Sequence, residues 1–317
     1  MKNSPCILFA GSSNITFATE IISKSDNIKL GEIYHHTFPN GEYYVQFKEN
    51  IRGSDVFLIQ TANGNMDSNS ALMQLLIMAD AARRASAGRI TAVCPAFFYQ
   101  RQDRKDRSRV PISAKLVMDI MAAAGINRII TMDLHAQQLQ GFTNLPLDHL
   151  YFQPTLIEAL KSLKLDVVVS PDLGAVKKAS EYSDKTGLDL AFLIKKRKND
   201  VLVEMSQFVG NIKDKRVIIL DDLTESAGTL VEAATVCKAQ GASEVYCAVT
   251  HGCLSELGIL RMTQANENGI INQFYCSNTV TEHTTSNRWA TIVSVADVFA
   301  KAILGIHNNT SITKLFN

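Results

Sequence analysis

Short apolar runs alternate with longer stretches of helical period along the whole chain, and this alternation constrains the fold more than any other feature. The short runs are entirely apolar or rich in β-branched residues, as buried parallel strands are. Parallel strands need a crossover connection, so the pattern predicts parallel sheets covered by helices on both faces. The expected strands are Ile7–Ala10, Asp55–Gln60, Arg89–Cys94, Arg128–Met132, Asp166–Ser170, Leu190–Lys195, Arg216–Leu220, Glu244–Thr250 and Ile270–Cys276. The expected helices are Asn69–Ala87, Ser113–Ala124, Leu173–Lys185, Thr229–Gln240, Ser255–Glu267 and Ala296–His307.

The strand and helix series occurs twice, which predicts two similar tandem domains of the α/β class. We place them at residues 1–148 and 149–317, with the boundary inside the segment Pro146–Pro154, which contains two prolines and aromatic residues. A length of 317 residues suits this division, because domains usually hold about 100–200 residues. Each domain is expected to be a mostly parallel sheet flanked by helices.

Composition excludes several classes of protein. Lys and Arg number 32 against 31 Asp and Glu, a net charge of +1, which argues against a disordered polyelectrolyte and against a generally basic nucleic-acid binder. No apolar run approaches the roughly 20 residues that span a bilayer, so we expect no membrane association. The six cysteines form no CxxC pair, which favours free thiols and a cytoplasmic location.

The stretch from Val217 to Leu230 carries the strongest chemical signal in the sequence. A buried strand ends in the adjacent acids Asp221 and Asp222, and a loop of small and hydroxylated residues then leads into a helix. Ligands of open α/β sheets bind at the carboxyl ends of strands, and a helix N-terminus presents free N–H groups to a phosphate. Ser226 and Thr229 add hydroxyl donors, while adjacent carboxylates hold ribose hydroxyls or a divalent cation. The alternative is an ordinary Asp-rich turn with a Ser N-cap.

Two further segments are candidate sites by their own chemistry. The basic run Arg101–Arg109 leaves the expected strand Arg89–Cys94 after three aromatic residues, a location that fits a nucleotide triphosphate better than DNA. The alternatives are a solvated surface or a nucleic-acid-binding patch. Asp133 and His135 lie two residues apart at the end of another expected strand, so their side chains share a face and could contact a metal or phosphate.

Several motifs, taken in order, carry a resemblance to a known family. The loop that follows Asp222 resembles the phosphoribosyl-binding motif of type I phosphoribosyltransferase folds. With it occur Phe38-Pro-Asn-Gly-Glu42, Pro95 to Lys105, Pro111 to Lys115, Asp133-Leu-His135, Ser170-Pro-Asp172, Lys195-Lys-Arg197, Thr250-His-Gly252 and Ser311 to Phe316. Together they resemble the ribose-phosphate pyrophosphokinase family, of its common phosphate-dependent class, over nearly the whole chain.

The resemblance implies an enzyme that transfers the diphosphoryl group of Mg-ATP to the 1-hydroxyl of ribose 5-phosphate, for nucleotide biosynthesis. It implies Lys195, Arg197 and Glu225 as catalytic residues and His135 with Asp172 as holders of Mg²⁺. The residues implied for ATP are Phe38, Asn40, Glu42, Arg101, Gln102, Asp106 and His135, with the first three coming from a neighbouring subunit. Those implied for ribose 5-phosphate are Asp221, Asp222, Glu225, Ser226, Ala227, Gly228 and Thr229. It further implies a homo-hexamer built from dimers, and an effector site for phosphate or ADP at Arg52, Arg84, Ser311 and Thr313. Four separated positions are a weak sequence signal by themselves, so an ordinary surface cluster is the alternative.

Three residues depart from the family pattern. Ala175 stands where a second glycine is common, and Glu225 and Ser226 stand in place of Asp and Thr. These departures motivate an alternative, a non-catalytic nucleotide-binding regulatory homologue. A phosphoribosyltransferase is a second alternative, against which the segment Arg101–Arg109 and the N-terminal half of the chain argue.

Overall fold

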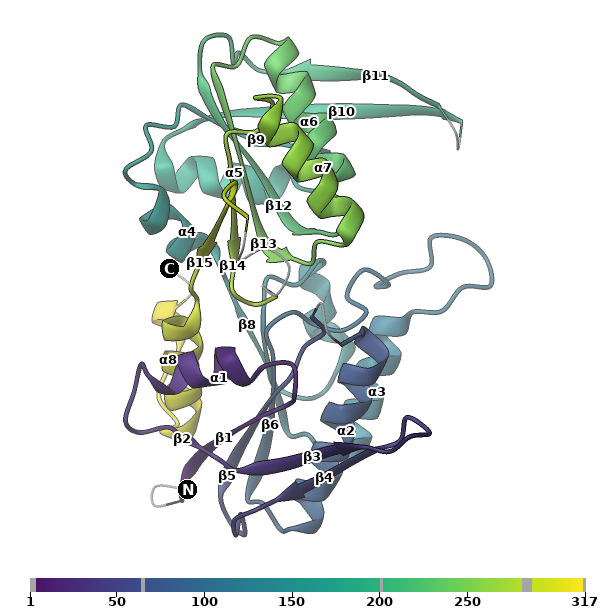
Figure 1. The fold of residues 1–317 in the computed structure, drawn as a ribbon, viewed down its shortest axis with the longest axis vertical. Helices are drawn as coiled ribbons and strands as arrows, with labels where there is room; N and C mark the ends of the chain where they lie inside the picture. Colours follow the sequence, from purple (N-terminus) through teal and green to yellow (C-terminus); the bar gives the residue numbers. More distant parts are fainter. Residues whose placement is uncertain (1–3, 64–65, 200–201, 281–286, 316–317) are drawn as a thin grey trace. The chain divides into compact units, whose positions relative to one another are not determined.

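The structure is a computed structural model that describes residues 4–63, 66–199, 202–280 and 287–315. For residues 195–199 and 202–207 it describes the backbone alone. The chain divides into two compact units: Met1–Phe152 with Ser294–Asn317, and Gln153–Val293 (Figure 1). Each unit is built on a mostly parallel sheet, so the predicted fold class is confirmed.

The division differs from the sequence-based one at the C-terminal end. We expected residues 149–317 to form the second domain, whereas Ser294–Asn317 pack with the first unit. This segment contains helix α8 (Ala296–His307), which buries Phe299 and Ile303 and packs on α1 (Ile15–Ile22). The rings of Phe17 and Phe299 meet edge to face at 5.4 Å between centroids. Helical periodicity reveals that α8 needs an apolar partner, but it does not reveal which unit supplies one.

The first unit has a six-stranded sheet in the order β2-β1-β5-β6-β7-β8, and every neighbouring pair is parallel. Its strands are β1 (Cys6–Ala10), β2 (Lys29–Leu30), β5 (Asp55–Ile59), β6 (Arg89–Cys94), β7 (Arg128–Met132) and β8 (Leu147–Leu150). Its other helical segments are α2 (Ser68–Arg84), α3 (Ser113–Ala124), η1 (Gln137–Phe142) and η2 (Thr313–Leu315). The core lies between the fully buried strands β1 and β5 and the inner faces of α2 and α3.

Two glycines of the first unit have different roles. Gly125 ends α3, with a φ of 106°. Gly88 lies beyond the end of α2, where an added Cβ would lie 2.7 Å from the carbonyl oxygen of Gly53. The absence of a side chain at Gly88 therefore allows its backbone to pack closely against that of Gly53.

A hairpin of β3 (Ile33–Thr37) and β4 (Tyr43–Phe47) forms a separate two-stranded sheet in the first unit. A tight turn forms its tip, where the amide of Phe38 donates to the carbonyl of Glu42 and Gly41 has a φ of 88°. Val45 is buried against the unit, while Tyr34, Phe38 and Tyr44 are each more than two-fifths exposed. One face of the hairpin is thus packed and the other carries aromatic side chains.

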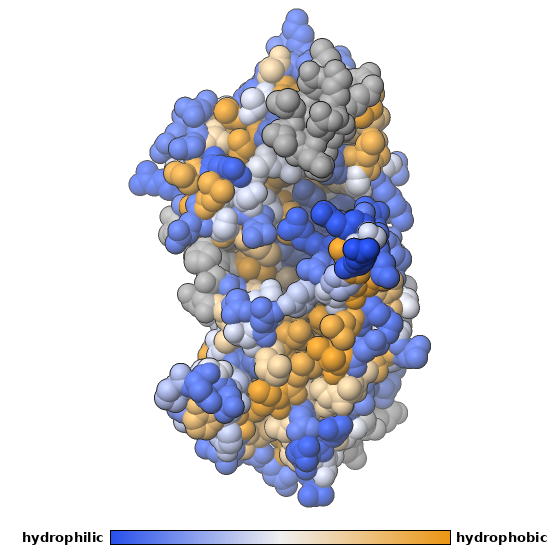
Figure 2. Space-filling view, turned by 90° about the vertical axis from the view of Figure 1, so that its right-hand side faces the viewer, coloured by the Kyte–Doolittle hydropathy of each residue, from blue (hydrophilic) through white to orange (hydrophobic). Residues whose placement is uncertain are grey.

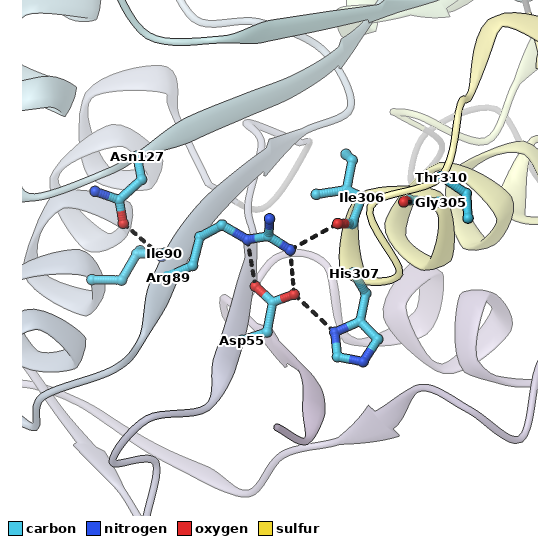
Figure 3. Close-up of polar contacts among 8 residues, drawn as sticks. All are labelled: Asp55, Arg89, Ile90, Asn127, Gly305, Ile306, His307 and Thr310. Carbon is cyan, nitrogen blue, oxygen red and sulfur yellow. Dashed lines mark hydrogen bonds and ion pairs between the residues drawn. The ribbon is translucent and has the colours of Figure 1, made fainter. Parts of the chain in front are cut away.

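A buried ion pair attaches the end of α8 to the sheet of the first unit (Figure 3). Asp55, at the start of β5, is fully buried, and Arg89 of β6 donates to its two carboxylate oxygens at 2.8 and 2.5 Å. Arg89 also donates to the carbonyl of Ile306, and Nδ1 of His307 lies 2.9 Å from Asp55 Oδ2. Two residues at the C-terminal end of α8 are therefore held at the amino ends of β5 and β6.

The second unit has a seven-stranded sheet in the order β11-β10-β9-β12-β13-β14-β15. Among the strands that the structure describes there, β10 and β11 alone pair in antiparallel fashion. The strands are β9 (Val167–Ser170), β10 (Asp189–Asn199), β11 (Leu202–Val209), β12 (Arg216–Thr224), β13 (Glu244–Gly252), β14 (Gln273–Ser277) and β15 (Ala290–Val293). The helices are α4 (Gln153–Leu160), α5 (Val176–Thr186), α6 (Gly228–Ala239) and α7 (Glu256–Glu267).

Two features of the whole chain bear on the expectations from composition. All six cysteines are free thiols, and five of them are buried. In the described part of the chain, every helix is too short or too polar to cross a membrane. Hydrophobic residues gather on one face of the first unit (Figure 2), and Met73 of α2 and Leu116 of α3 are 55% and 59% exposed.

Candidate functional site

The carboxyl end of β12 carries the two adjacent acids that the sequence singled out. Residues Val217–Leu220 of β12 are buried between β9 and β13, and Asp221 and Asp222 follow in the same strand. The amide of Asp222 donates to Oδ1 of Asp221 at 2.9 Å. Because both neighbouring strands run parallel to β12, their carboxyl ends meet at this edge, where α/β sheets bind ligands.

The electrostatics of this edge are unfavourable without a ligand. Burial, the negative charge of Asp222 and, more weakly, that of Asp172 raise the pKa of Asp221 well above its usual range. Asp172, which follows β9, is thus close enough to act on a carboxyl group of β12. An edge with several carboxylates is suited to binding a cation, which offsets their negative charge, or sugar hydroxyls, which donate hydrogen bonds to them.

The loop between β12 and α6 forms a turn suited to an anion. Ala227 precedes α6 in a left-handed conformation, with φ of 55° and ψ of 6°, and its side chain is buried. An alanine has no polar group with which to cap the helix, so the first amides of α6 retain their donor capacity for a ligand. Glu225 and Ser226 are exposed just before this turn, and Thr229 is exposed in the first turn of α6.

The loop after β9 is shaped by Asp172. One oxygen of its carboxylate accepts from the amides of Gly174 and Ala175 at 2.8 and 3.0 Å, and Ser170 Oγ donates to its backbone carbonyl at 2.7 Å. Ala175 has a φ of −88°, so this departure from the family pattern imposes no left-handed backbone here. Helix α5 begins at Val176, three residues later than expected, because residues 172–175 form the loop.

Lys178 is a residue of this edge that the sequence reasoning missed. Its Nζ lies 3.3 Å from Oγ1 of Thr250 and 3.5 Å from the carbonyl oxygen of Asp221, so α5 brings a cation close to the ends of β12 and β13. Its position in the first turn of the helix after β9 is the signal that could have found it. A lysine here offsets part of the negative charge of the edge.

Lys195 and Arg197, the expected catalytic cations, lie in β10. The backbone there continues as a strand to Asn199 and pairs with β11, with Lys195 opposite Ser206 and Arg197 opposite Val203. We expected the strand to end at Lys195, so the strand is longer than predicted. Their side chains lie outside the described part of the structure.

The first unit brings two of the expected ATP-binding segments to one sheet edge. Arg101 and Gln102 follow β6 and are exposed, and His135 follows the neighbouring parallel strand β7 and is exposed too. The amide of His135 donates to Oε1 of the buried Gln100 at 3.0 Å, which joins the two segments. Asp106 is exposed further along the first segment and pairs with Arg107 at 3.5 Å.

The remaining expected residues also lie in the first unit. Phe38, Asn40 and Glu42 are exposed at the tip of the β3–β4 hairpin, where Asn40 Oδ1 accepts from the amide of Glu42 at 3.1 Å. Their predicted contact with ATP, from a neighbouring subunit, is untested by one chain and stays a prediction.

The four expected effector-site residues are found near one end of the first sheet. Arg52 and Arg84 precede β5 and β6, and the amide of Gly53 donates to the carbonyl of Ser86 at 2.9 Å. Ser311 and Thr313 follow α8, whose end is held at the start of the same strands, and their hydroxyl oxygens are 2.9 Å apart. The role of these four residues as an effector site stays a prediction.

Comparison with known proteins identifies relatives over the full chain. Residues 6–125 match the model of the N-terminal domain of ribose phosphate pyrophosphokinase, and residues 205–317 match the phosphoribosyl synthetase-associated domain. A ribose-phosphate pyrophosphokinase A of Dictyostelium discoideum is 42% identical over 98% of this chain and 97% of its own length. A ribose-phosphate pyrophosphokinase of Clostridium perfringens is also 42% identical, with the same coverage.

A solved structure supports the same relationship. The phosphoribosylpyrophosphate synthetase of Mycobacterium smegmatis superposes with a TM-score of 0.88 and 36% sequence identity, covering 96% of this chain and 99% of that one. These relatives are named as enzymes, and they match this chain over nearly their whole length. This does not favour the alternative of a non-catalytic regulatory homologue.

Proposed function

This chain belongs to the ribose-phosphate pyrophosphokinase family, and we propose that it is the enzyme that makes phosphoribosyl pyrophosphate and AMP from ribose 5-phosphate and ATP. The observation that carries the proposal is one edge of the second unit. There the acids Asp221 and Asp222 end a buried strand, and the anion-binding turn at Ala227 follows at once. An acidic pair beside a phosphate-binding turn matches a sugar phosphate, whose hydroxyls and phosphate lie at opposite ends.

In this proposal the chain's residues mainly position the reactants. Asp221 and Asp222 accept hydrogen bonds from the ribose hydroxyls, and residues 226–229 hold the 5-phosphate. Glu225 orients the 1-hydroxyl and accepts its proton as the oxygen attacks the β-phosphorus of ATP. The bond from the β-phosphorus to the bridging oxygen of the α-phosphate breaks, so AMP leaves and the diphosphoryl group stays on the sugar. Positioning and neutralisation of charge supply most of the acceleration in phosphoryl transfer.

The residues proposed for ATP are those that the family resemblance implies. Arg101, Gln102 and Asp106 are proposed to contact the nucleotide, and Lys195 and Arg197 to offset charge on the transferring group. Phe38, Asn40 and Glu42 are proposed to reach the base from a neighbouring subunit.

Magnesium is the metal that the residues fit. It binds one or two carboxylates, substrate phosphates and retained waters, so it does not require a cluster of three protein ligands. Among the described residues there is no such cluster, while Asp172 lies close enough to Asp221 for its charge to raise that group's pKa. We propose that Asp172 and His135 hold the ion, which would supply charge neutralisation for the phosphates of ATP.

The assembly and its regulation are further parts of the proposal. The exposed apolar residues Met73 and Leu116 support self-association, and we propose a homo-hexamer built from dimers. Phosphate and ADP would act as effectors at Arg52, Arg84, Ser311 and Thr313. Six free thiols are consistent with a cytoplasmic location.

Product analysis tests the proposed reaction. The protein is incubated with Mg-ATP and ribose 5-phosphate, and ³¹P NMR is used to follow AMP and a diphosphate attached to C1 of ribose. Lys195→Ala should reduce kcat by about 10²-fold or more, as the loss of one preorganised donor does. Lys185→Ala, in the last turn of α5, is the matched control. Formation of a nucleotide from phosphoribosyl pyrophosphate and a nucleobase, without AMP formation, would instead identify a phosphoribosyltransferase.

A further inference from the structure

One face of α7 contacts the backbone of the proposed ribose 5-phosphate loop. The amide and the hydroxyl of Ser255, the N-cap residue of α7, both donate to the carbonyl oxygen of Glu225, at 3.0 and 3.2 Å. Arg261 Nη1 donates to the carbonyl oxygen of Ser226 at 3.0 Å. Positions 255, 258 and 261 are three residues apart, so they lie along one side of the helix.

Gly258 is the third position of this face. It is buried in α7, and a Cβ added to it would lie 2.2 Å from the carbonyl oxygen of Glu225. That distance is far below a normal contact, and the clashing atom is backbone, which cannot rotate away. Glycine is therefore required for α7 to approach the loop this closely.

The contacts to two consecutive carbonyl groups fix the direction of the next two amides. In a planar trans peptide the C=O and N–H bonds point in opposite directions. Since α7 holds the carbonyls of Glu225 and Ser226, the N–H groups of Ser226 and Ala227 must point away from α7. The left-handed conformation of Ala227 then starts α6, whose first amides lie in the same loop.

From this geometry we infer that Ser255, Gly258 and Arg261 are positioning residues for the 5-phosphate of ribose 5-phosphate. They act through the backbone of residues 225 and 226, which they hold so that the amides of the loop face the phosphate. The inference rests on the proposed function, because that function assigns the loop to ribose 5-phosphate. It adds a helix that none of the motifs discussed above includes.

The test compares Michaelis constants for the two substrates in Arg261→Met and Gly258→Ala. Arg261→Met removes the hydrogen bond that the charged guanidinium donates to the carbonyl of Ser226. We therefore expect the KM for ribose 5-phosphate to rise about tenfold or more. The KM for ATP should change less than about twofold, since ATP is bound elsewhere, and Arg261→Lys should recover part of the loss. Leu260→Ala is the control, because Leu260 lies on α7 and is 53% exposed.

Calorimetric titration of each protein with ribose 5-phosphate separates this inference from the proposed function. A wild-type protein that binds ribose 5-phosphate without forming product would refute the proposed function, while weakened binding in Arg261→Met would still support the positioning role. Equal affinity and equal KM for ribose 5-phosphate in the wild type and Arg261→Met would overturn the inference. Because Gly258→Ala could impair folding, its melting temperature is measured, and Arg261→Met decides the question if Gly258→Ala is unfolded.

Discussion

The carboxyl groups of Asp221 and Asp222 are adjacent at the end of a buried strand, and the amide of Asp222 donates to Oδ1 of Asp221 at 2.9 Å. Burial first, and the charge of Asp222 second, raise the pKa of Asp221 from an ordinary 3.8 to about 8. The pair is therefore strained electrostatically when no ligand is bound. Such strain is typical of a functional site, where a ligand relieves it.

This pKa shift predicts how stability depends on pH. Between pH 3.8 and about 8 the folded protein retains a proton on Asp221 that the unfolded chain has released, so stability falls as pH rises through this window. Asp221→Asn removes the dependence and should raise the melting temperature of the ligand-free protein at pH 8 but not at pH 4. Thermal unfolding of both proteins from pH 4 to pH 9 measures the difference. Asp184→Asn, at an exposed position of α5, is the control, and equal pH profiles for wild type and Asp221→Asn would contradict the argument.

The buried pair at the end of α8 predicts a large loss of stability. Arg89→Met removes the guanidinium group that pairs with the fully buried carboxylate of Asp55. The contact of this carboxylate with His307 remains. Removing one partner of a buried ion pair typically costs about 3–5 kcal/mol in the free energy of unfolding. Urea unfolding of the wild type, Arg89→Met and the double variant Asp55→Asn with Arg89→Met measures the cost. The double variant should recover part of it, and a single variant as stable as the wild type would show that the pair is dispensable.

Regulation provides a separate prediction. If Arg52 and Arg84 bind phosphate or ADP, Arg52→Ala and Arg84→Ala should lose ADP inhibition and phosphate activation while retaining turnover at saturating ATP and ribose 5-phosphate. Arg83→Ala is the matched control, because Arg83 and Arg84 both pair with Asp80 from the same end of α2. Initial rates are measured over a range of ADP and phosphate concentrations. Unaltered responses in the Arg52 and Arg84 variants would reject this effector site.

Periodicity predicted the regular helices and strands well, and it failed where tertiary contacts decide the structure. Arg128–Met132, Ser113–Ala124 and Ala296–His307 begin and end as expected. The β3–β4 hairpin was not predicted as a pair of strands, because strands that are exposed on one face lack the continuous apolar run of the parallel strands. The attachment of α8 to the first unit depends on Asp55 and Arg89, more than 200 positions away in the sequence.

The candidate site shows the same limit. The acids of β12 and the loop after them could be found because their residues are consecutive. Gly258 could not, since it acts on that loop from another helix, and a glycine in a helical stretch has no distinctive sequence signal. The approach of Gly258 to Glu225 is visible only as a contact between backbones.

Glu225 provides the sharpest test of the proposed chemistry. Its backbone carbonyl is held by Ser255, and it is exposed on the loop before α6, where a carboxylate one methylene longer than the family's Asp can reach the ribose. As an orienting base it requires its negative charge, so Glu225→Gln should reduce kcat by about 10²–10⁴-fold. Glu225→Asp should restore the family pattern and keep most of the turnover.

The competing role for Glu225 is electrostatic support of α6, and the same variants discriminate between the two. A carboxylate near a helix N-terminus stabilises it by about 0.3–1 kcal/mol, so that role predicts a slightly lower melting temperature for Glu225→Gln with turnover unchanged. The chemical role instead predicts a large loss of kcat, with a melting temperature close to that of the wild type. Both quantities are measured on the two variants, with Glu232→Gln, in the middle of α6, as the control. Near-wild-type kcat in Glu225→Gln would exclude Glu225 as the base, because the amide preserves shape and removes only the charge and the proton-accepting oxygen.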